Sequence, residues 1–407
     1  MKNSNFNAIG RLSLHRDLDF IMGPLWGGAA TSARFAKTAF ATDDELTVKH
    51  WAAGTFRYGY YNHFFSRFVG KPAKKVKGVV IATDDNALIT KKMEFQKNKK
   101  GDVVTFALVD PLAGEGVIDD ETLEDREEAI TSHDFDITLR RRRHATRSEG
   151  EMSDRRPAFD VKVKSKSVLG MWLARIHDRD IMAAMSGVAN SVGTIAAAAP
   201  TTNRHWYGGQ TAAGTVAPVA NDAAIISATD HLFGEHVIEY VKRLATVNEP
   251  IIRPIIIGGQ EFYLMFIHAY QAKALRACTD YKAALQSARE RSASNPLFSG
   301  ALGEWDGVAV HVLPWIETRL GAGGSTASEY FELADDCASG ITVARALFCG
   351  AQAACVAYGG TPKWVEDKFD YDNEWGIALS LFYAAAKPVF NSEDYGVIAV
   401  DTAIVPD

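Results

Sequence analysis

The sequence predicts an α+β protein, and two kinds of pattern carry that prediction. Short segments such as residues 135–140 alternate apolar and polar side chains, and a period of two indicates strands with one apolar face. Longer segments carry apolar residues at helical spacing, above all residues 160–187. The chain has 407 residues, 47% of them apolar, so it can bury a large core and form two or more domains.

The first fifty residues show little periodicity and are expected to form an N-terminal arm. In the segment that follows, aromatic residues recur at close to a four-residue spacing: Trp51, Phe56, Tyr60, Phe64 and Phe68. This spacing predicts one aromatic face of a helix over residues 51–69. The face packs either on the core of its own chain or on a neighbouring subunit.

Residues 84–147 combine strand patterning with high charge. They hold 26 charged residues in 64 positions, whereas 23% of the whole chain is charged. Residues 104–108 and 135–140 are strand-like, and residues 97–102 predict a turn. Strands this charged cannot close a large core of their own, so we expect their apolar face to pack on another copy of the protein.

Two charged runs lie in the same segment. Residues 119–128 carry seven acids and one arginine, and residues 140–143 are four arginines. The acidic run of one subunit can pair with the basic run of the next, which would fix the register more than the affinity. Two alternatives stay open: both runs are solvated faces, or the basic run touches nucleic acid, although strand side chains alternate between faces. The candidate contacts are Glu115, Glu121, Glu124, Arg140, Arg141, Arg142 and Arg143.

The second half of the chain is predicted as alternating helix and strand after the long helix over residues 160–187, which ends near Gly187. Helices are expected over residues 234–246, 261–276 and 335–358, and strands over residues 251–257, 307–312, 377–382 and 395–400. The most apolar stretch, residues 341–358, contains Arg345. A central arginine costs about 2.5–3.5 kcal/mol in a membrane span, so we interpret this stretch as a buried helix.

No motif for catalysis, cofactor binding or metal binding appears, and the eleven histidines are scattered. The four cysteines, Cys278, Cys337, Cys349 and Cys355, form no paired motif. Buried thiols are expected, with a disulfide or zinc site as the alternative. The formal charge of −6 argues against a dedicated nucleic-acid binder but permits a container for nucleic acid. The N-terminus shows no secretory signal, so we expect synthesis in the cytoplasm.

Several short motifs occur in a fixed order along the chain: residues 86–89, 100–106, 112–117, 123–129, 143–145, 295–303, 305–308 and 348–354. Each is weak alone, but their order and spacing are specific. From about residue 51 to the C-terminus, the chain resembles the major capsid protein family of N4-like tailed phages.

The resemblance implies the HK97-like capsid fold. Residues 1–70 would form the N-terminal arm and aromatic helix, 71–150 the extended E-loop region, 151–199 the P-domain spine helix, 200–360 the A-domain, and 361–407 strands that return to the P-domain. Some relatives crosslink lysine to asparagine, and the loop lysines Lys97, Lys99 and Lys100 are the candidates for contacts there, although no acceptor is identified.

The resemblance also implies a function. The expected protein is a non-enzymatic virion subunit that self-assembles into hexamers and pentamers of an icosahedral shell around double-stranded DNA, bound without sequence specificity. Portal, scaffold and decoration proteins are the further expected partners, and no cofactor or membrane is expected. The alternatives are an encapsulin-like compartment shell and a soluble α+β enzyme without a local motif.

Overall fold

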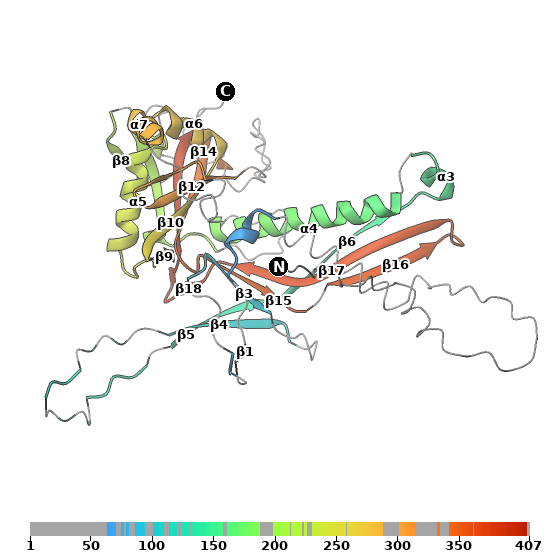
Figure 1. Ribbon diagram of the computed structural model, residues 1–407, viewed down its shortest axis with the longest axis horizontal. Coiled ribbons are helices and arrows are strands. Elements are labelled where there is room, and N and C mark those ends of the chain that lie inside the picture. The colour runs from blue at the N-terminus through green and yellow to red at the C-terminus, as the bar shows by residue number, and fades with distance from the viewer. Residues whose placement is uncertain are drawn as a thin grey trace, which may run out of the picture. The chain divides into compact units, whose positions relative to one another are not determined.

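The computed structural model describes the following residues: 63–70, 75–76, 79–80, 86–93, 101–109, 112, 114, 116–119, 122, 124, 126–130, 132–157, 161–187, 198–211, 213–221, 224–225, 230–257, 259–287, 301–313, 332–333, 342–360 and 362–404. All of them belong to one compact unit, Glu45–Asp407. Two large sheets organise this unit (Figure 1).

The first sheet has five strands within the described residues: β16 (Lys363–Phe369), β17 (Glu374–Ala386), β15 (Ala354–Tyr358), β3 (Ile89–Met93) and β6 (Arg140–Arg147). β17 is the longest strand. It pairs with β16 and β15 along one edge and with β6 along the other, and Tyr383 lies opposite Arg140. Alternate residues of β17, such as Leu379 and Leu381, are buried, which gives the period of two expected for a sheet covered on that face.

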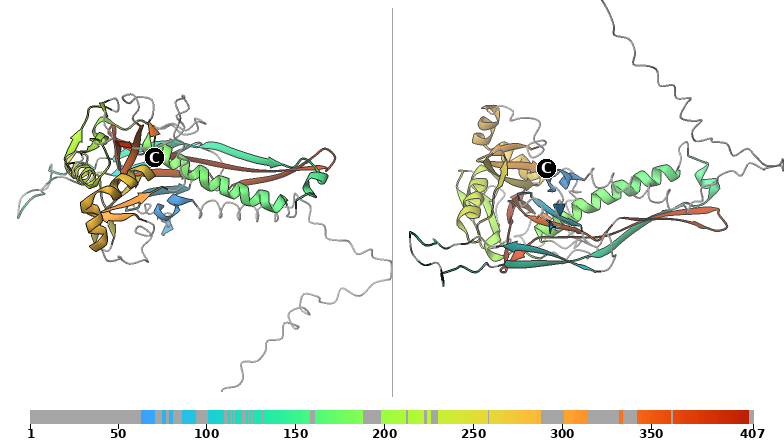
Figure 2. Two further views of the ribbon diagram at one scale, coloured as in Figure 1. Left: turned by 90° about the horizontal axis from the view of Figure 1, so that it is seen from above. Right: turned by 60° about the horizontal axis from the view of Figure 1, so that its bottom comes forward.

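Helix α4 (Val161–Ser186) lies along this sheet and covers the face that carries Leu379 and Leu381 (Figures 1 and 2). Leu169 and Leu173 are buried in the shared core, which confirms the long helix and its apolar stripe. Val168, predicted in that stripe, is exposed instead. The helix ends at Gly187, whose positive φ of 74° is a left-handed conformation that favours glycine. A short helix, α3 (Glu151–Asp154), precedes α4.

A hairpin of β4 (Val103–Val109) and β5 (Ser132–Thr138) confirms the two predicted strands and lies on the opposite face of the sheet. Its apolar residues form one cluster with small residues of β15 and β17: Val104, Phe106, Ile137, Leu139, Cys355, Ala357 and Ala384. The expectation that this apolar face needs another copy is therefore wrong for the base of the hairpin. The small side chains of the same chain's sheet leave room for the hairpin to pack there.

The second sheet has nine strands among the described residues. Its main order is β11 (Gly303–Trp305), β12 (Val308–Val312), β10 (Gln260–Ile267), β14 (Thr342–Cys349), β20 (Val397–Ile404), β7 (His205–Gln210) and β8 (Val216–Pro218). β9 (Ile255–Ile257) pairs with β10, and β13 (Glu332–Leu333) pairs with β14. Three helices pack on this sheet: α5 (Glu235–Val247), α6 (Ala269–Ala277) and α7 (Thr279–Ser287). Their buried residues form one apolar cluster with residues of its strands.

Small elements complete the described structure: the 3-10 helices η1 (Phe64–Phe68) and η2 (Thr202–Arg204), and the two-stranded pairs β1 (Lys75–Val76) with β2 (Val79–Val80) and β18 (Val389–Phe390) with β19 (Glu393–Asp394). Phe64 and Phe68 are buried in the core of their own chain. These two aromatic residues therefore pack on their own chain rather than on a neighbouring subunit. Trp51, Phe56 and Tyr60 lie outside the described residues.

Two predicted helices are wrong. Residues 335–358 contain β14 and β15, joined by a turn at residues 350–353, and residues 261–276 contain most of β10 followed by α6. Both errors have one cause: strands buried on both faces read as continuous apolar runs without alternation. The helix predicted over residues 234–246 and the strand predicted over residues 307–312 are confirmed as α5 and β12.

The C-terminal strands divide between the sheets. β16 and β17 belong to the five-stranded sheet that carries α4. β20 instead lies between β14 and β7 in the nine-stranded sheet, where Thr342 pairs with Ile404 and Cys349 with Val397. β14 and β15 connect the two sheets directly. The predicted domain boundary near residue 360 therefore does not separate the strands of the two sheets.

Candidate assembly interface

The five-stranded sheet has an open face beside the β4–β5 hairpin. Antiparallel register places side chains of β6, β17 and β16 in rows across this face, and one row is Arg143, Ser380 and Lys363. In the next row the Arg141 guanidinium lies 5.8 Å from the centroid of the Phe382 ring, and Phe382 is 50% exposed. Exposed apolar surface beside unburied arginine is the composition that protein interfaces favour.

The open face continues to the far ends of β6 and β16. The Arg147 guanidinium lies 4.3 Å from the centroid of the Phe369 ring and also pairs with Glu374 at 2.5 Å. Val365 is exposed on the same face. The described surface thus combines four cationic side chains, three exposed apolar ones and two acids: Arg141, Arg143, Arg147, Lys363, Phe382, Val365, Phe369, Asp367 and Glu374. We call this set of nine residues the open face.

Arg142 does not belong to the open face. Its side chain is 12% exposed, points toward α4, and forms an ion pair with Asp180, which also accepts a hydrogen bond from the Tyr383 hydroxyl. Asp180 is 1% exposed. The prediction of Arg142 as a contact to a neighbour is therefore corrected: alternation along β6 turns this arginine into its own chain.

The remaining predicted contacts divide by position. Arg140, Arg141 and Arg143 are exposed on β6, and Glu124 is exposed in the segment between β4 and β5. That segment also exposes large apolar side chains: Leu112, Ile118 and Ile130. Glu115, Glu121, Lys97, Lys99 and Lys100 lie outside the described residues.

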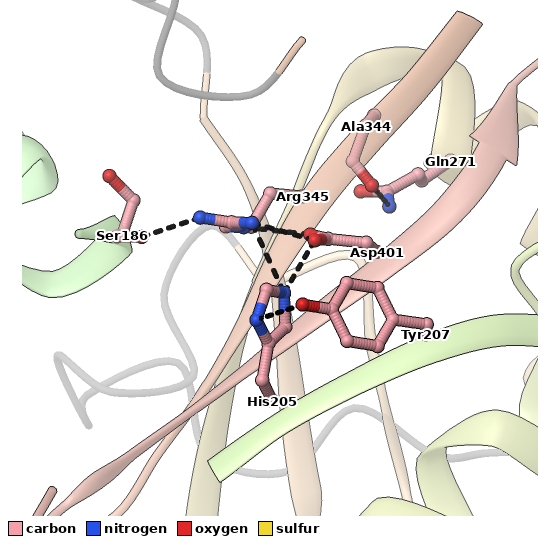
Figure 3. Close-up of polar contacts among 7 residues, drawn as sticks. All are labelled: Ser186, His205, Tyr207, Gln271, Ala344, Arg345 and Asp401. Carbon is pink, nitrogen blue, oxygen red and sulfur yellow. Dashed lines mark hydrogen bonds and ion pairs between the residues drawn. The ribbon is translucent and has the colours of Figure 1, made fainter. Parts of the chain in front are cut away.

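A buried polar network joins α4 to the nine-stranded sheet (Figure 3). Arg345 on β14 donates to both carboxylate oxygens of Asp401 on β20, at 2.7 Å and 2.6 Å, and to the carbonyl of Ser186 at the end of α4, at 2.8 Å. The His205 Nε2 atom lies 2.6 Å from Asp401, and the Tyr207 hydroxyl lies 2.8 Å from His205 Nδ1. The cation thus meets both a carboxylate and the negative end of a helix dipole.

The environment of Asp401 fixes its charge. Burial alone would raise the pKa of this carboxyl, but hydrogen bonds from Arg345 and His205 hold its pKa below the ordinary value. In the sequence, Arg345 argues only against a membrane span. A single charge inside an apolar run was the available signal of a buried pair, but its partner lies 56 positions away and no local pattern points to it.

A second buried ion pair lies within residues 387–394, and hydrogen bonds tie this segment to residues 201–204 after α4. Lys387 Nζ lies 2.7 Å from the Asp394 carboxylate, and both side chains are almost fully buried. Arg204 donates to the Asp394 carbonyl at 3.1 Å, and Thr201 donates from its hydroxyl to Glu393 at 2.7 Å. These contacts hold β18 and β19 against η2.

The described residues offer no group of three or more histidine, cysteine or acidic side chains that could hold a metal ion. The described cysteines, Cys278, Cys349 and Cys355, are free thiols, and burial raises the pKa of Cys355 to about 12. Cys337 lies outside the described residues. In the part of the chain that is described, no helix has the length and apolar character needed to span a membrane.

Comparison with known proteins gives a consistent result. A family model described as phage capsid protein matches residues 39–406. The major capsid protein of Pseudomonas phage KPP25 is 29% identical over 393 residues, which cover 91% of this chain and 98% of that protein. These matches confirm the resemblance that the ordered sequence motifs indicated.

Solved structures agree on the fold. The capsid of Ralstonia phage GP4 matches with a TM-score of 0.67 and 24% identity over 93% of this chain and 99% of that chain. The capsid of cyanophage Pam1 matches with a TM-score of 0.61 and 18% identity over 84% of this chain and 92% of that chain. The expected α+β tailed-phage capsid fold is therefore confirmed.

Proposed function

Since this chain belongs to the phage capsid protein family, it is a structural subunit of a phage capsid rather than an enzyme, and we propose that it forms the hexamers and pentamers of an icosahedral shell around double-stranded DNA. The observation that carries the proposal is the open face, an arginine-rich and partly apolar sheet surface that its own chain leaves uncovered among the described residues.

The occupant of the open face is the segment between β4 and β5 of a neighbouring subunit. Its described residues include exposed acids, among them Asp119 and Glu124, and the exposed apolar Leu112, Ile118 and Ile130. Acids complement the arginines, and the apolar residues complement the exposed side chains of the sheet. Charge would select the register, and apolar burial at about 25 cal/mol per Å² would supply most of the affinity.

The topology favours another copy for this role. β5 leads through Leu139 directly into β6, so the segment between β4 and β5 leaves the hairpin at the end farthest from β6 (Figure 1). A subunit cannot easily fold that segment back over its own β6. A neighbour that lies beside it can reach the open face without such a reversal.

The test is the double substitution Arg141→Glu with Arg143→Glu, because both side chains are exposed on the open face. We expect a normally folded subunit that no longer assembles, or that assembles only at lower yield, measured by sedimentation velocity and negative-stain microscopy. Arg155→Glu is the matched control, since Arg155 is 74% exposed and pairs with Glu151 one helical turn away rather than on the open face. Normal shells from the double variant would refute the docking.

Arg142→Glu separates folding from assembly. The glutamate would face Asp180 inside the subunit, so we expect loss of folding rather than a selective loss of assembly. A folded Arg142→Glu monomer that fails only in assembly would contradict the inward position of this residue in solution.

The wider partners follow from the same proposal. Double-stranded DNA would be enclosed without sequence specificity, and portal, scaffold and decoration proteins would complete the particle after synthesis in the host cytoplasm. Particles that protect DNA from nuclease would support the virion shell. Particles that carry a copurifying enzyme and no DNA would support the encapsulin-like alternative.

A further inference from the structure

His177 occupies an unusual position in the interior between α4 and the five-stranded sheet. It is 1% exposed, and its ring centroid lies 4.8 Å from the Tyr383 ring and 5.9 Å from the Tyr358 ring. Among the described residues, neither ring nitrogen has a hydrogen-bond partner. An imidazole in this position is tolerated only while it is neutral, because a buried charge needs a partner.

The titratable groups near His177 come from every element packed around the ring: His63 before η1, Lys91 on β3, Arg142 on β6, Tyr358 on β15, Tyr383 on β17, and the carboxylates Asp178 and Asp180 on α4 itself. His63, Lys91 and Arg142 would oppose a proton on the ring, whereas the two carboxylates would favour one. Burial, followed by the charges of His63, Arg142 and Lys91, holds the pKa of His177 well below its ordinary value of 6.5.

The two neighbouring carboxylates already have partners in other elements. Asp178 accepts hydrogen bonds from the backbone N–H groups of Phe64 and Phe65, at 2.8 Å and 3.1 Å, and lies 3.2 Å from His63. Asp180 holds Arg142 and Tyr383. Neither carboxylate can turn to a charged His177 without releasing η1 or β6.

We propose that His177 is an acid-sensitive switch that loosens the packing of α4 against η1 and the five-stranded sheet. When the ring gains a proton, the new cation faces Arg142, Lys91 and His63, and the nearest relief is to separate α4 from the sheet. The nine-stranded sheet carries none of the groups that face His177, so it should stay folded. The inference does not depend on the shell proposal, because every contact lies within one subunit.

The direction of the pH effect follows from linkage. The opened state binds a proton with an ordinary histidine pKa near 6.5, whereas the closed state binds it only at lower pH. The closed packing is therefore fully favoured above pH 6.5 and weakens as the pH falls below it. One proton makes the opening equilibrium constant rise by up to about tenfold for each pH unit.

The experiment is hydrogen exchange of the full, unassembled chain between pH 7.5 and 5, corrected for the intrinsic pH dependence of exchange. In the wild-type protein, we expect the protection of α4 to fall below pH 6.5 by up to about tenfold per pH unit. In His177→Leu, this pH dependence should disappear while α4 stays protected. His231→Leu is the matched control, because His231 is also buried but lies beside the nine-stranded sheet, and it should keep the wild-type behaviour of α4.

The outcome is decisive in either direction. Protection of α4 that does not change with pH in the wild-type protein, or the same acid loss in His177→Leu, would overturn the proposal. If His177→Leu does not fold at pH 7.5, His177→Gln provides the second variant, because its side chain is neutral at every pH tested. An acid loss that persists in His177→Gln would also overturn the proposal.

Discussion

The buried pair of Arg345 and Asp401 should respond very differently to single and to double substitution. Arg345→Met removes both hydrogen bonds to Asp401 and leaves a carboxylate with 0% side-chain exposure beside His205 alone. An uncompensated buried charge of this kind costs about 3–5 kcal/mol in the free energy of unfolding. The Ser186 carbonyl at the end of α4 loses its donor as well.

The double variant Arg345→Met with Asp401→Leu removes both charges. It should destabilise the protein by only about 1–3 kcal/mol, mainly because the Ser186 carbonyl stays buried without its donor. The two single variants and the double variant form a double-mutant cycle, measured by urea denaturation of the unassembled protein. The exposed pair of Glu151 and Arg155 gives the matched control cycle, with an expected coupling below about 1 kcal/mol.

The pair also has a defined pH window. The pKa of Asp401 in the folded chain lies below its ordinary value of 3.8, so the contribution of the pair is present above that value and is lost as the pH falls through the lowered pKa. The reasoning is refuted if Arg345→Met costs under about 1 kcal/mol at pH 7, or if the double variant is as unstable as Arg345→Met.

Three further substitutions test other parts of the fold. Phe106→Ala should cost about 3–5 kcal/mol by leaving a cavity at the base of the hairpin, and a loss below 1 kcal/mol in urea denaturation would show that this base is loosely packed. Gly209→Ala should prevent folding at 37 °C, because its added Cβ would lie 2.2 Å from the Leu232 carbonyl oxygen; soluble protein with a normal circular dichroism spectrum would contradict this. Glu366→Gln should lower stability at pH 7, since Glu366 pairs with Lys162 at 2.7 Å. Burial would raise the pKa of Glu366, but the hydrogen bond and the charge of Lys162 help to lower it on balance. The difference in stability between Glu366→Gln and the wild-type protein should therefore vanish as the pH falls below 4.5. A stability difference that persists at about pH 2.5 would refute the role of this ion pair.

Local patterns in the sequence were enough where one face of an element is buried. β4, β5, α4 and α5 each show alternation or helical spacing, and the structure confirms all four. The patterns failed where both faces are buried. β10 and β14 form the interior of the nine-stranded sheet, and their uninterrupted apolar runs gave no period from which a strand could be told from a helix.

The interface was only partly accessible from the sequence. The run of residues 140–143 located the right strand, but only the register against β17 shows that Arg142 points inward to Asp180 while Arg141 and Arg143 point outward. That choice depends on which face α4 covers, and this is a property of the tertiary structure. The partners of Arg345 and the neighbours of His177 depend in the same way on contacts between distant parts of the chain.

We propose that the segment between β4 and β5 of one subunit docks on the open face of the next. A cryo-electron microscopy map of the assembled particle would show this contact. We expect density for this segment across Arg141, Arg143 and Phe382 of an adjacent subunit in a closed shell. A shell in which Phe382 and both arginines face solvent, or are covered by the same chain's own segment, would contradict it.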